Sequence, residues 1–334
     1  MAEQMAQLPS GVEICYETFG DPDHPALLLV MGLGGPMTWW SVELCSRLAD
    51  RGFHVIRFDN RDIGRSSRIV PLHRASRRTA VTTWLGMRRN AEYALSDLAD
   101  DAFGLLDHLD VERAHVYGVS MGGMIAQTMA IARPSRVLSL VSMMSTTGRR
   151  SVGWQDPRLV PMLLSPTPRS RDEYVSRAHK ISTMIGSPGY PVDAEDTRIR
   201  AEETWDRGYH PAGVLRQMLA VISQPDRTPA LRELDTPTCV IHGLADRMVH
   251  TSGGRATAAA IRGAELVLIP RMGHDLPVPL YDTFVDAVAR TAARADGVDP
   301  SLVPRRSADS QRNDGRYGAD RRRTSDGSTR VRWG

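Results

Sequence analysis

One pentapeptide has the residue types of a nucleophile turn. Gly118-Val119-Ser120-Met121-Gly122 follows a short apolar stretch and precedes an apolar, helix-like one. A G-x-S-x-G sequence between a strand and a helix forms a tight turn, because its two small residues let both backbone segments pass closely. Such a turn exposes the serine at the helix N-terminus, where the helix dipole favours negative charge. We therefore predict that Ser120 is a catalytic nucleophile.

A serine hydroxyl is a weak nucleophile, so a general base and an acid that orients this base must accompany it. In a parallel sheet with such a turn, the acid and then the histidine follow the serine along the chain. His274 comes just after the last predicted strand, and Asp246 follows the strand before it. Residues 143–147, where the acid often lies instead, contain no carboxylate. The sequence predicts the triad Ser120, Asp246 and His274.

Two backbone N–H groups could stabilise the negative charge that forms on the substrate oxygen. Met121 supplies the first N–H of the predicted helix. The loop Met31-Gly32-Leu33-Gly34-Gly35 follows the first apolar strand and is flexible enough to turn an N–H towards Ser120. The N–H groups of Leu33 and Met121 are therefore the predicted oxyanion hole.

Short apolar strands alternate with helix-like stretches along most of the chain. The predicted strands are residues 26–31, 53–58, 114–117, 137–143, 238–242 and 265–269. Strands that are apolar on both faces are typical of parallel sheets covered by helices on both sides. An alternating stretch at residues 11–20 predicts an early strand pair. We expect an α/β fold: a mostly parallel, twisted central sheet with flanking helices.

The same alternation divides the chain into four parts. Residues 1–146 and 231–295 are predicted to form the core of the fold. Residues 147–230, between them, contain helical patches but no buried strand, so we expect an inserted helical lid over the carboxyl ends of the strands. Residues 296–334 are polar and rich in Gly, Ser, Arg and Asp, which predicts a disordered tail.

Together these features resemble the α/β-hydrolase fold superfamily over residues 10–295, including the frequent pattern at residues 93–101 before the nucleophile strand. Two departures are similar to bacterial carboxylesterases of the anthracycline (aclacinomycin) methylesterase type. Met31-Gly32 replaces the common His-Gly, and residues 59–66, DNRDIGRS, replace D-x-R-G-x-G-x-S. The resemblance implies hydrolysis of a carboxylic ester through an acyl-enzyme on Ser120.

Other activities share this triad. Thioesterases, perhydrolases and enzymes that hydrolyse carbon–carbon bonds use the same residues, and these alternatives stay open. Some relatives have lost the triad and act as binding proteins, which is a more remote alternative here because all three positions are filled. A small-molecule ester is the expected partner, and no cofactor or metal is expected.

Apolar residues near the predicted triad suggest that this ester is apolar. The tentative substrate pocket consists of Trp39, Trp40, Met144 and Met248. Each of these side chains could equally belong to the ordinary core. The sequence leaves the physiological ester and the oligomeric state open.

The composition bears on other partners. The net charge of +3 arises from residues 296–334, so no basic face for nucleic acid is implied. Three scattered cysteines cannot form a disulfide framework or a metal cluster. The polar start and the lack of a long apolar run predict a cytoplasmic protein without a transmembrane segment. The Arg-rich residues 66–90 allow a weak membrane-surface contact, although a solvated loop is the simpler interpretation.

Overall fold

The computed structural model describes residues 2–70, 91–163 and 165–297. The predicted membrane contact at residues 66–90 therefore lies largely outside the described residues, as does nearly all of the predicted tail. Within them, the strands form one eight-stranded sheet in the order β1-β2-β4-β3-β5-β6-β7-β8. The strands are β1 (Gln4–Gln7), β2 (Glu13–Phe19), β3 (Ala26–Val30), β4 (His54–Phe58), β5 (Ala114–Val119), β6 (Val137–Met143), β7 (Thr238–Gly243) and β8 (Glu265–Ile269).

The sheet is parallel from β4 to β8 and antiparallel at its first edge, where β2 pairs with both β1 and β4. The mostly parallel α/β sheet predicted from the sequence is thus confirmed. The prediction of two strands within residues 11–20 is wrong, because this stretch holds only β2. Its partner β1 is a polar edge strand in which only Ala6 is buried, so it carries little apolar signal.

Alternate residues of the central strands point to opposite faces, and both faces are buried. In β3, Leu28 and Val30 belong to one apolar core, and Leu27 and Leu29 belong to the other. Helices α3 and α4 contribute to the first core, and α1 and α11 to the second. The covering helices are α1 (Val42–Ala49), α3 (Leu95–His108), α4 (Met121–Ala132), α9 (Thr228–Leu231), α10 (Ser252–Ala260) and α11 (Tyr281–Ala295).

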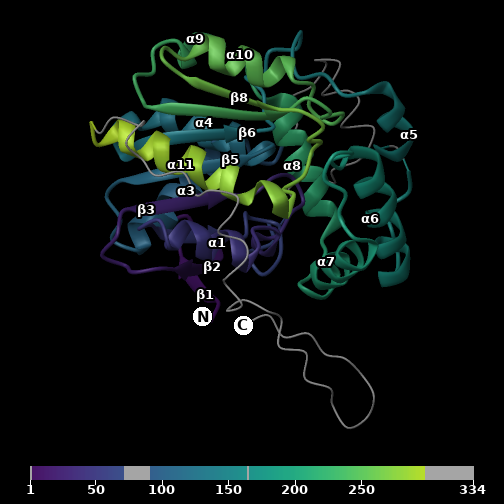
Figure 1. Cartoon of the computed structure of the whole chain (residues 1–334). Coiled ribbons are helices and arrows are strands. Elements are labelled where there is room, and N and C mark those ends of the chain that lie inside the picture. Colours follow the sequence, from purple (N-terminus) through teal and green to yellow (C-terminus); the bar gives the residue numbers. More distant parts are fainter. Residues whose placement is uncertain (1, 71–90, 164, 298–334) are drawn as a thin grey trace, which may run out of the picture.

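Residues 147–230, called the helical segment from here on, connect β6 to β7. Their described residues contain helices and no strand. Figure 1 shows these helices gathered beside one end of the sheet. They are α5 (Val160–Leu163), α6 (Arg171–Ile185), α7 (Ala194–Asp206) and α8 (Pro211–Ser223). Short 3-10 turns lie at Met37–Trp39, Pro134–Arg136, Pro157–Leu159 and Val278–Leu280.

Two buried ion pairs join the helical segment to the loop after β4. Arg207, just after α7, places Nη2 2.8 Å from Oδ2 of Asp59. Arg216 of α8 donates from Nε to Oδ2 of Asp62 over 2.8 Å. Because all four side chains are almost fully buried, removing either arginine would leave a buried carboxylate without its ion-pair partner. The helical segment is therefore firmly attached on this side.

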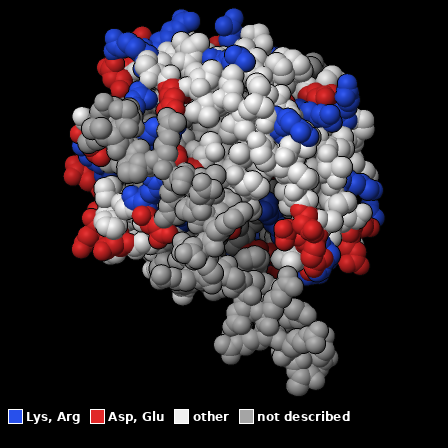
Figure 2. All heavy atoms as spheres, viewed as in Figure 1, with Lys and Arg blue, Asp and Glu red and all other residues white. Residues whose placement is uncertain are grey.

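The surface seen in Figure 2 carries charges of both signs around its rim, while the middle of this face is mostly uncharged. No single sign of charge dominates the described part of this view. Among the described residues, no helix combines the length and the apolar character needed to cross a bilayer.

Candidate active site

The turn that carries Ser120 depends on the two glycines that flank it. Ser120 has φ 55° and ψ −119°, a strained conformation for a residue with a side chain. A Cβ on Gly118 would lie 2.1 Å from the carbonyl oxygen of Gly122, and one on Gly122 would lie 2.0 Å from that of Val30. The backbone of Ser120 is held by a hydrogen bond from its N–H to Met143 O, 2.9 Å long. This close packing fixes the serine between β5 and α4.

The structure brings the three predicted triad residues together. Nε2 of His274 lies 3.0 Å from Oγ of Ser120, and Nδ1 lies 2.7 Å from Oδ2 of Asp246. A carboxylate only accepts hydrogen bonds, so Nδ1 carries the proton and Nε2 is free to accept one from the serine. The N–H groups of Met248 and Val249 both donate to the other oxygen, Oδ1, of Asp246. The Asp246 carboxylate is thereby held in place by two backbone N–H groups and by the imidazole of His274.

A second histidine, His242, also contacts Asp246. Its Nε2 lies 3.3 Å from Oδ2 of Asp246 and donates to Val249 O over 2.8 Å. Burial alone would raise the pKa of Asp246, but the charge of His274 and hydrogen bonds from both histidines outweigh burial and hold this pKa well below its ordinary value. Asp246 is therefore ionised at neutral pH. Sequence reasoning missed His242 as a partner, since it lies within β7; its position four residues before the acid was the available signal.

The loop after β3 lies against the serine. A Cβ built on Gly32 would be 3.2 Å from Cβ of Ser120, so these two residues are in contact. Within the described residues, the N–H groups of Leu33 and Met121 donate to no protein acceptor. Asn60 Nδ2 donates to Met31 O over 3.1 Å and helps to fix this loop. Both N–H groups of the predicted oxyanion hole are thus unused by protein acceptors among these residues.

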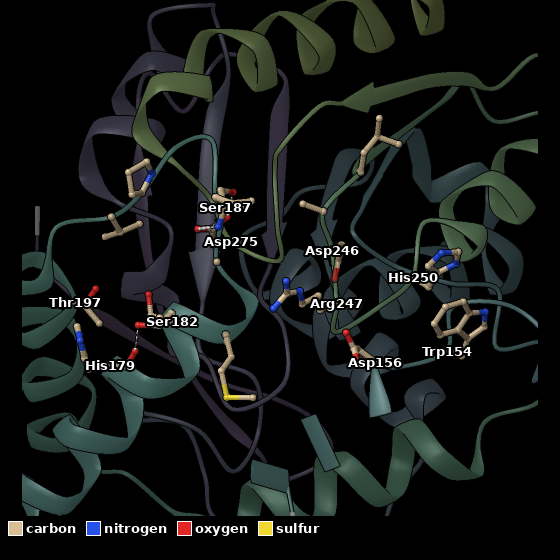
Figure 3. A pocket seen from close by; sticks show the side chains of 18 residues that line it. Trp154, Asp156, His179, Ser182, Ser187, Thr197, Asp246, Arg247, His250 and Asp275 are labelled. Carbon is tan, nitrogen blue, oxygen red and sulfur yellow. Dashed lines mark hydrogen bonds between the residues drawn. The ribbon is translucent and has the colours of Figure 1, made fainter. Parts of the chain in front are cut away.

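A cavity of about 520 Å³ lies between the end of α6 and the loop after β7. Figure 3 shows Arg247 between its two walls, with Trp154 and His250 at one side. These two rings are stacked, with centroids 4.0 Å apart. The cavity reaches the triad at Asp246 alone; Ser120 and His274 are not in its lining. Most lining residues come from the helical segment, where the sequence offers no motif that would point to them.

The four residues predicted to form the substrate pocket do not line this cavity. Trp40 is fully buried in the core and meets the ring of Tyr117 edge-on at 4.9 Å, so its role in this structure is packing. Met144 is buried in the same core. Trp39 instead donates from Nε1 to Oγ1 of Thr204 in α7, over 3.0 Å. Met248 lies beside Gln155, next to the acid loop.

The described residues contain no group of three or more His, Cys, Asp or Glu side chains suited to a metal ion. The three cysteines, Cys15, Cys45 and Cys239, are buried and unpaired with one another. Burial raises the pKa of each thiol to about 12. They are therefore protonated at neutral pH and are poor nucleophiles.

Comparisons with known proteins agree with this geometry. Residues 25–278 match the family described as "alpha/beta hydrolase fold". Rhodomycin D methylesterase DauP of Streptomyces sp. (strain C5) is 31% identical over 301 residues, which cover 83% of this chain and 94% of that protein. Rhodomycin D methylesterase DnrP of Streptomyces peucetius is 30% identical, with the same coverage of 83% and 94%.

Solved structures share the fold. The enol-lactonase from Burkholderia xenovorans LB400 superimposes with a TM-score of 0.68 over 86% of this chain and 99% of its own. Its sequence identity is 21%, so this likeness concerns the fold alone. The family match covers most of the described residues, including positions 120, 246 and 274. The chain belongs to the α/β hydrolase fold family.

Proposed function

We propose that the protein is a carboxylic ester hydrolase in which Ser120 is the nucleophile, His274 the general base and Asp246 the orienting acid. The observation that carries this proposal is the unbroken hydrogen-bond chain of 3.0 Å and 2.7 Å through the imidazole of His274. Two further observations support it. The strained turn exposes the serine at the start of α4, and two relatives at 31% and 30% identity are named methylesterases.

The reaction proceeds in two acyl transfers. Oγ of Ser120 attacks the ester carbonyl carbon while Nε2 of His274 takes the hydroxyl proton. The carbonyl oxygen becomes an oxyanion, which accepts hydrogen bonds from the N–H groups of Leu33 and Met121. The intermediate then expels the alcohol, which receives the proton from His274 and leaves an acyl-enzyme.

Water completes the cycle. His274 takes a proton from water, the resulting hydroxide attacks the acyl carbon, and the carboxylic acid is released as Ser120 regains its proton. The negative charge of Asp246 stabilises the imidazolium in both halves of the reaction. This role requires an ionised carboxylate, which agrees with the lowered pKa of Asp246. We propose a small-molecule ester as the substrate, and the names of the two Streptomyces relatives favour a methyl ester.

A labelling experiment tests the nucleophile. A fluorophosphonate should label the folded wild-type protein at Ser120, and Ser120→Ala should abolish both labelling and ester hydrolysis with an unchanged melting temperature. We expect a loss of at least about 10⁴-fold in kcat, the usual consequence of removing a triad member. Labelling at another residue, or turnover by the alanine variant, would refute the assignment.

Matched oxygen esters and thioesters of the same acyl group test the substrate class. The proposal requires a higher kcat/KM for the methyl oxygen ester than for its thioester. A reversed preference would identify a thioesterase that uses the same three residues.

A further inference from the structure

The end of α6 is hydrogen-bonded to the loop that carries His274. The N–H of His274 donates to Ile185 O over 2.7 Å, and the N–H of Gly273 donates to Oγ of Ser187 over 2.8 Å. A Cβ on Gly273 would lie 2.3 Å from the carbonyl oxygen of Gly186, so the two backbones are in direct contact. The helical segment thus reaches the base of the proposed triad through backbone groups.

Ser187 joins both sides of His274. Its hydroxyl accepts from Gly273 and donates to Oδ1 of Asp275, while its own N–H donates to Oδ2 of Asp275 over 3.0 Å. Figure 3 shows Ser187 and Asp275 side by side at the edge of the cavity. Ser187 is only 4% exposed, so water competes little for these bonds. Gly273, His274 and Asp275 are therefore all held by residues 185–187.

The helical segment also holds the loop after β3, which contacts Ser120. Gln217 of α8 is fully buried and accepts a 2.9 Å hydrogen bond from the N–H of Gly34. Its Nε2 donates to Arg61 O over 3.1 Å. Its chain neighbour Arg216 is fixed by the buried pair with Asp62. Gln217 is therefore itself held in place, and it binds Gly34, the residue after Leu33.

We propose that the helical segment positions groups of the catalytic centre. Ser187 is a positioning residue for His274, and Gln217 is a positioning residue for the N–H of Leu33. This inference rests on the proposed ester hydrolysis. Displacing the whole segment, as a simple lid would be displaced, breaks the support of the general base and of the oxyanion hole together. Substrate entry must therefore leave residues 185–187 and Gln217 in place.

Ser187→Ala tests the support of the base, and Ser182→Ala is its matched control. Ser182 lies in α6, five residues before Ser187, and lines the same cavity, but its side chain has no hydrogen bond to the loop of His274 among the described residues. We expect Ser187→Ala to lower kcat by about 10- to 100-fold, because a small misplacement of a catalytic group has this effect. KM should change little, and the rate of fluorophosphonate labelling should fall in proportion to kcat. Ser187→Thr, which keeps the hydroxyl, should recover most of the rate.

Proton NMR gives a readout that needs no turnover. The low-field signal of the proton between His274 and Asp246 should broaden or shift in Ser187→Ala and stay unchanged in Ser182→Ala. A lower stability of the fold would not by itself change this one signal, provided that it is recorded at a temperature where both variants are folded. Since no substrate is involved, this measurement tests the inference even if the proposed ester hydrolysis fails.

Gln217→Met tests the support of the oxyanion hole, with the exposed Gln155→Met of the same segment as control. We expect the affinity for a trifluoromethyl ketone, an analogue of the tetrahedral intermediate, to fall by the same factor as kcat/KM. Wild-type rates, wild-type NMR signals and wild-type inhibitor affinity in both Ser187→Ala and Gln217→Met would overturn the inference. An inactive wild-type protein would instead refute the proposed function, which keeps the two failures distinct.

Discussion

Nε2 of His242 lies 3.3 Å from Oδ2 of Asp246, the same carboxylate oxygen that faces Nδ1 of His274. The two imidazoles have different environments. Nε2 of His242 also donates to Val249 O, and its Nδ1 faces Gly254 without a polar partner in the described residues. His242 thus contacts the carboxylate without reaching the serine, whereas His274 connects the carboxylate to Ser120. The contacts with both imidazoles stabilise the negative charge of Asp246.

Asp246→Asn should lower kcat by about 10⁴-fold while the fold is retained, because the neutral amide no longer selects the tautomer of His274 that can accept the serine proton. The rate of ester hydrolysis and the melting temperature measure the two effects separately. His242→Gln is the control, since its amide keeps a donor near Val249 O. This control should lose far less activity. Equal losses in both variants would show that the role of the Asp246 carboxylate is not specific to its contact with His274.

The proposed triad could be assembled from the sequence because each of its members occupies a position that local sequence defines. Ser120 is framed by two glycines at which a Cβ would clash with the backbone, and Asp246 and His274 each follow an apolar stretch that forms a strand, β7 and β8. Parallel strands bring their carboxyl ends to one edge of the sheet, so such positions meet whatever the intervening chain does. This is why positions far apart in sequence could be grouped without a structure.

The supports of the site were not predictable from residue patterns. Ser187 and Gln217 bind the backbone N–H groups of Gly273 and Gly34, and a backbone donor leaves no trace in the sequence. The neighbouring tryptophans show the same limit. Trp39 reaches α7 while Trp40 fills the core, and only the packing of α1 and α11 around β5 decides which ring turns inward.

His115 makes stability depend on pH. Burial lowers its pKa to about 4, while a histidine in the unfolded chain titrates near 6.5. Above about pH 6.5 neither state binds the proton, so the full stability is present. As the pH falls from about 6.5 towards 4, the unfolded chain binds a proton that the folded state does not bind. The free energy of unfolding therefore decreases by up to about 3 kcal/mol.

Melting temperatures of the wild type and of His115→Asn check this dependence. The asparagine lacks the titrating group but keeps a polar atom near Oγ of Ser139, which lies 2.8 Å from Nδ1 of His115. The wild type should lose stability more steeply than the variant between about pH 6.5 and 4.5. Parallel curves over this range would contradict a lowered pKa of His115.

Asp62 stands where the wider superfamily has a glycine, and it has φ 72°. Asp62→Gly relieves this conformation but leaves the buried guanidinium of Arg216 without its carboxylate. We expect a net destabilisation of about 3 kcal/mol in denaturant unfolding, because an uncompensated buried charge costs more than the backbone strain. Adding Arg216→Met should recover a large part of this loss, since both charges are then absent. Additive losses in the double variant would show that the two residues do not interact.

Gly122→Ala should be among the most harmful single-methyl changes in the chain. The new Cβ would meet the carbonyl oxygen of Val30 at 2.0 Å, and β3 cannot move away because both of its faces are buried. We expect a loss above about 3 kcal/mol in the free energy of unfolding, beyond the usual cost of overpacking, together with lost activity. Gly104→Ala is the matched control. There the Cβ would meet Cδ1 of Leu8 at 3.2 Å, which is the end of a flexible side chain, and the gain in helix propensity of up to about 1 kcal/mol offsets the small shift. Similar denaturation midpoints for the two variants would mean that the close approach of β3 to the start of α4 is not what requires glycine at position 122.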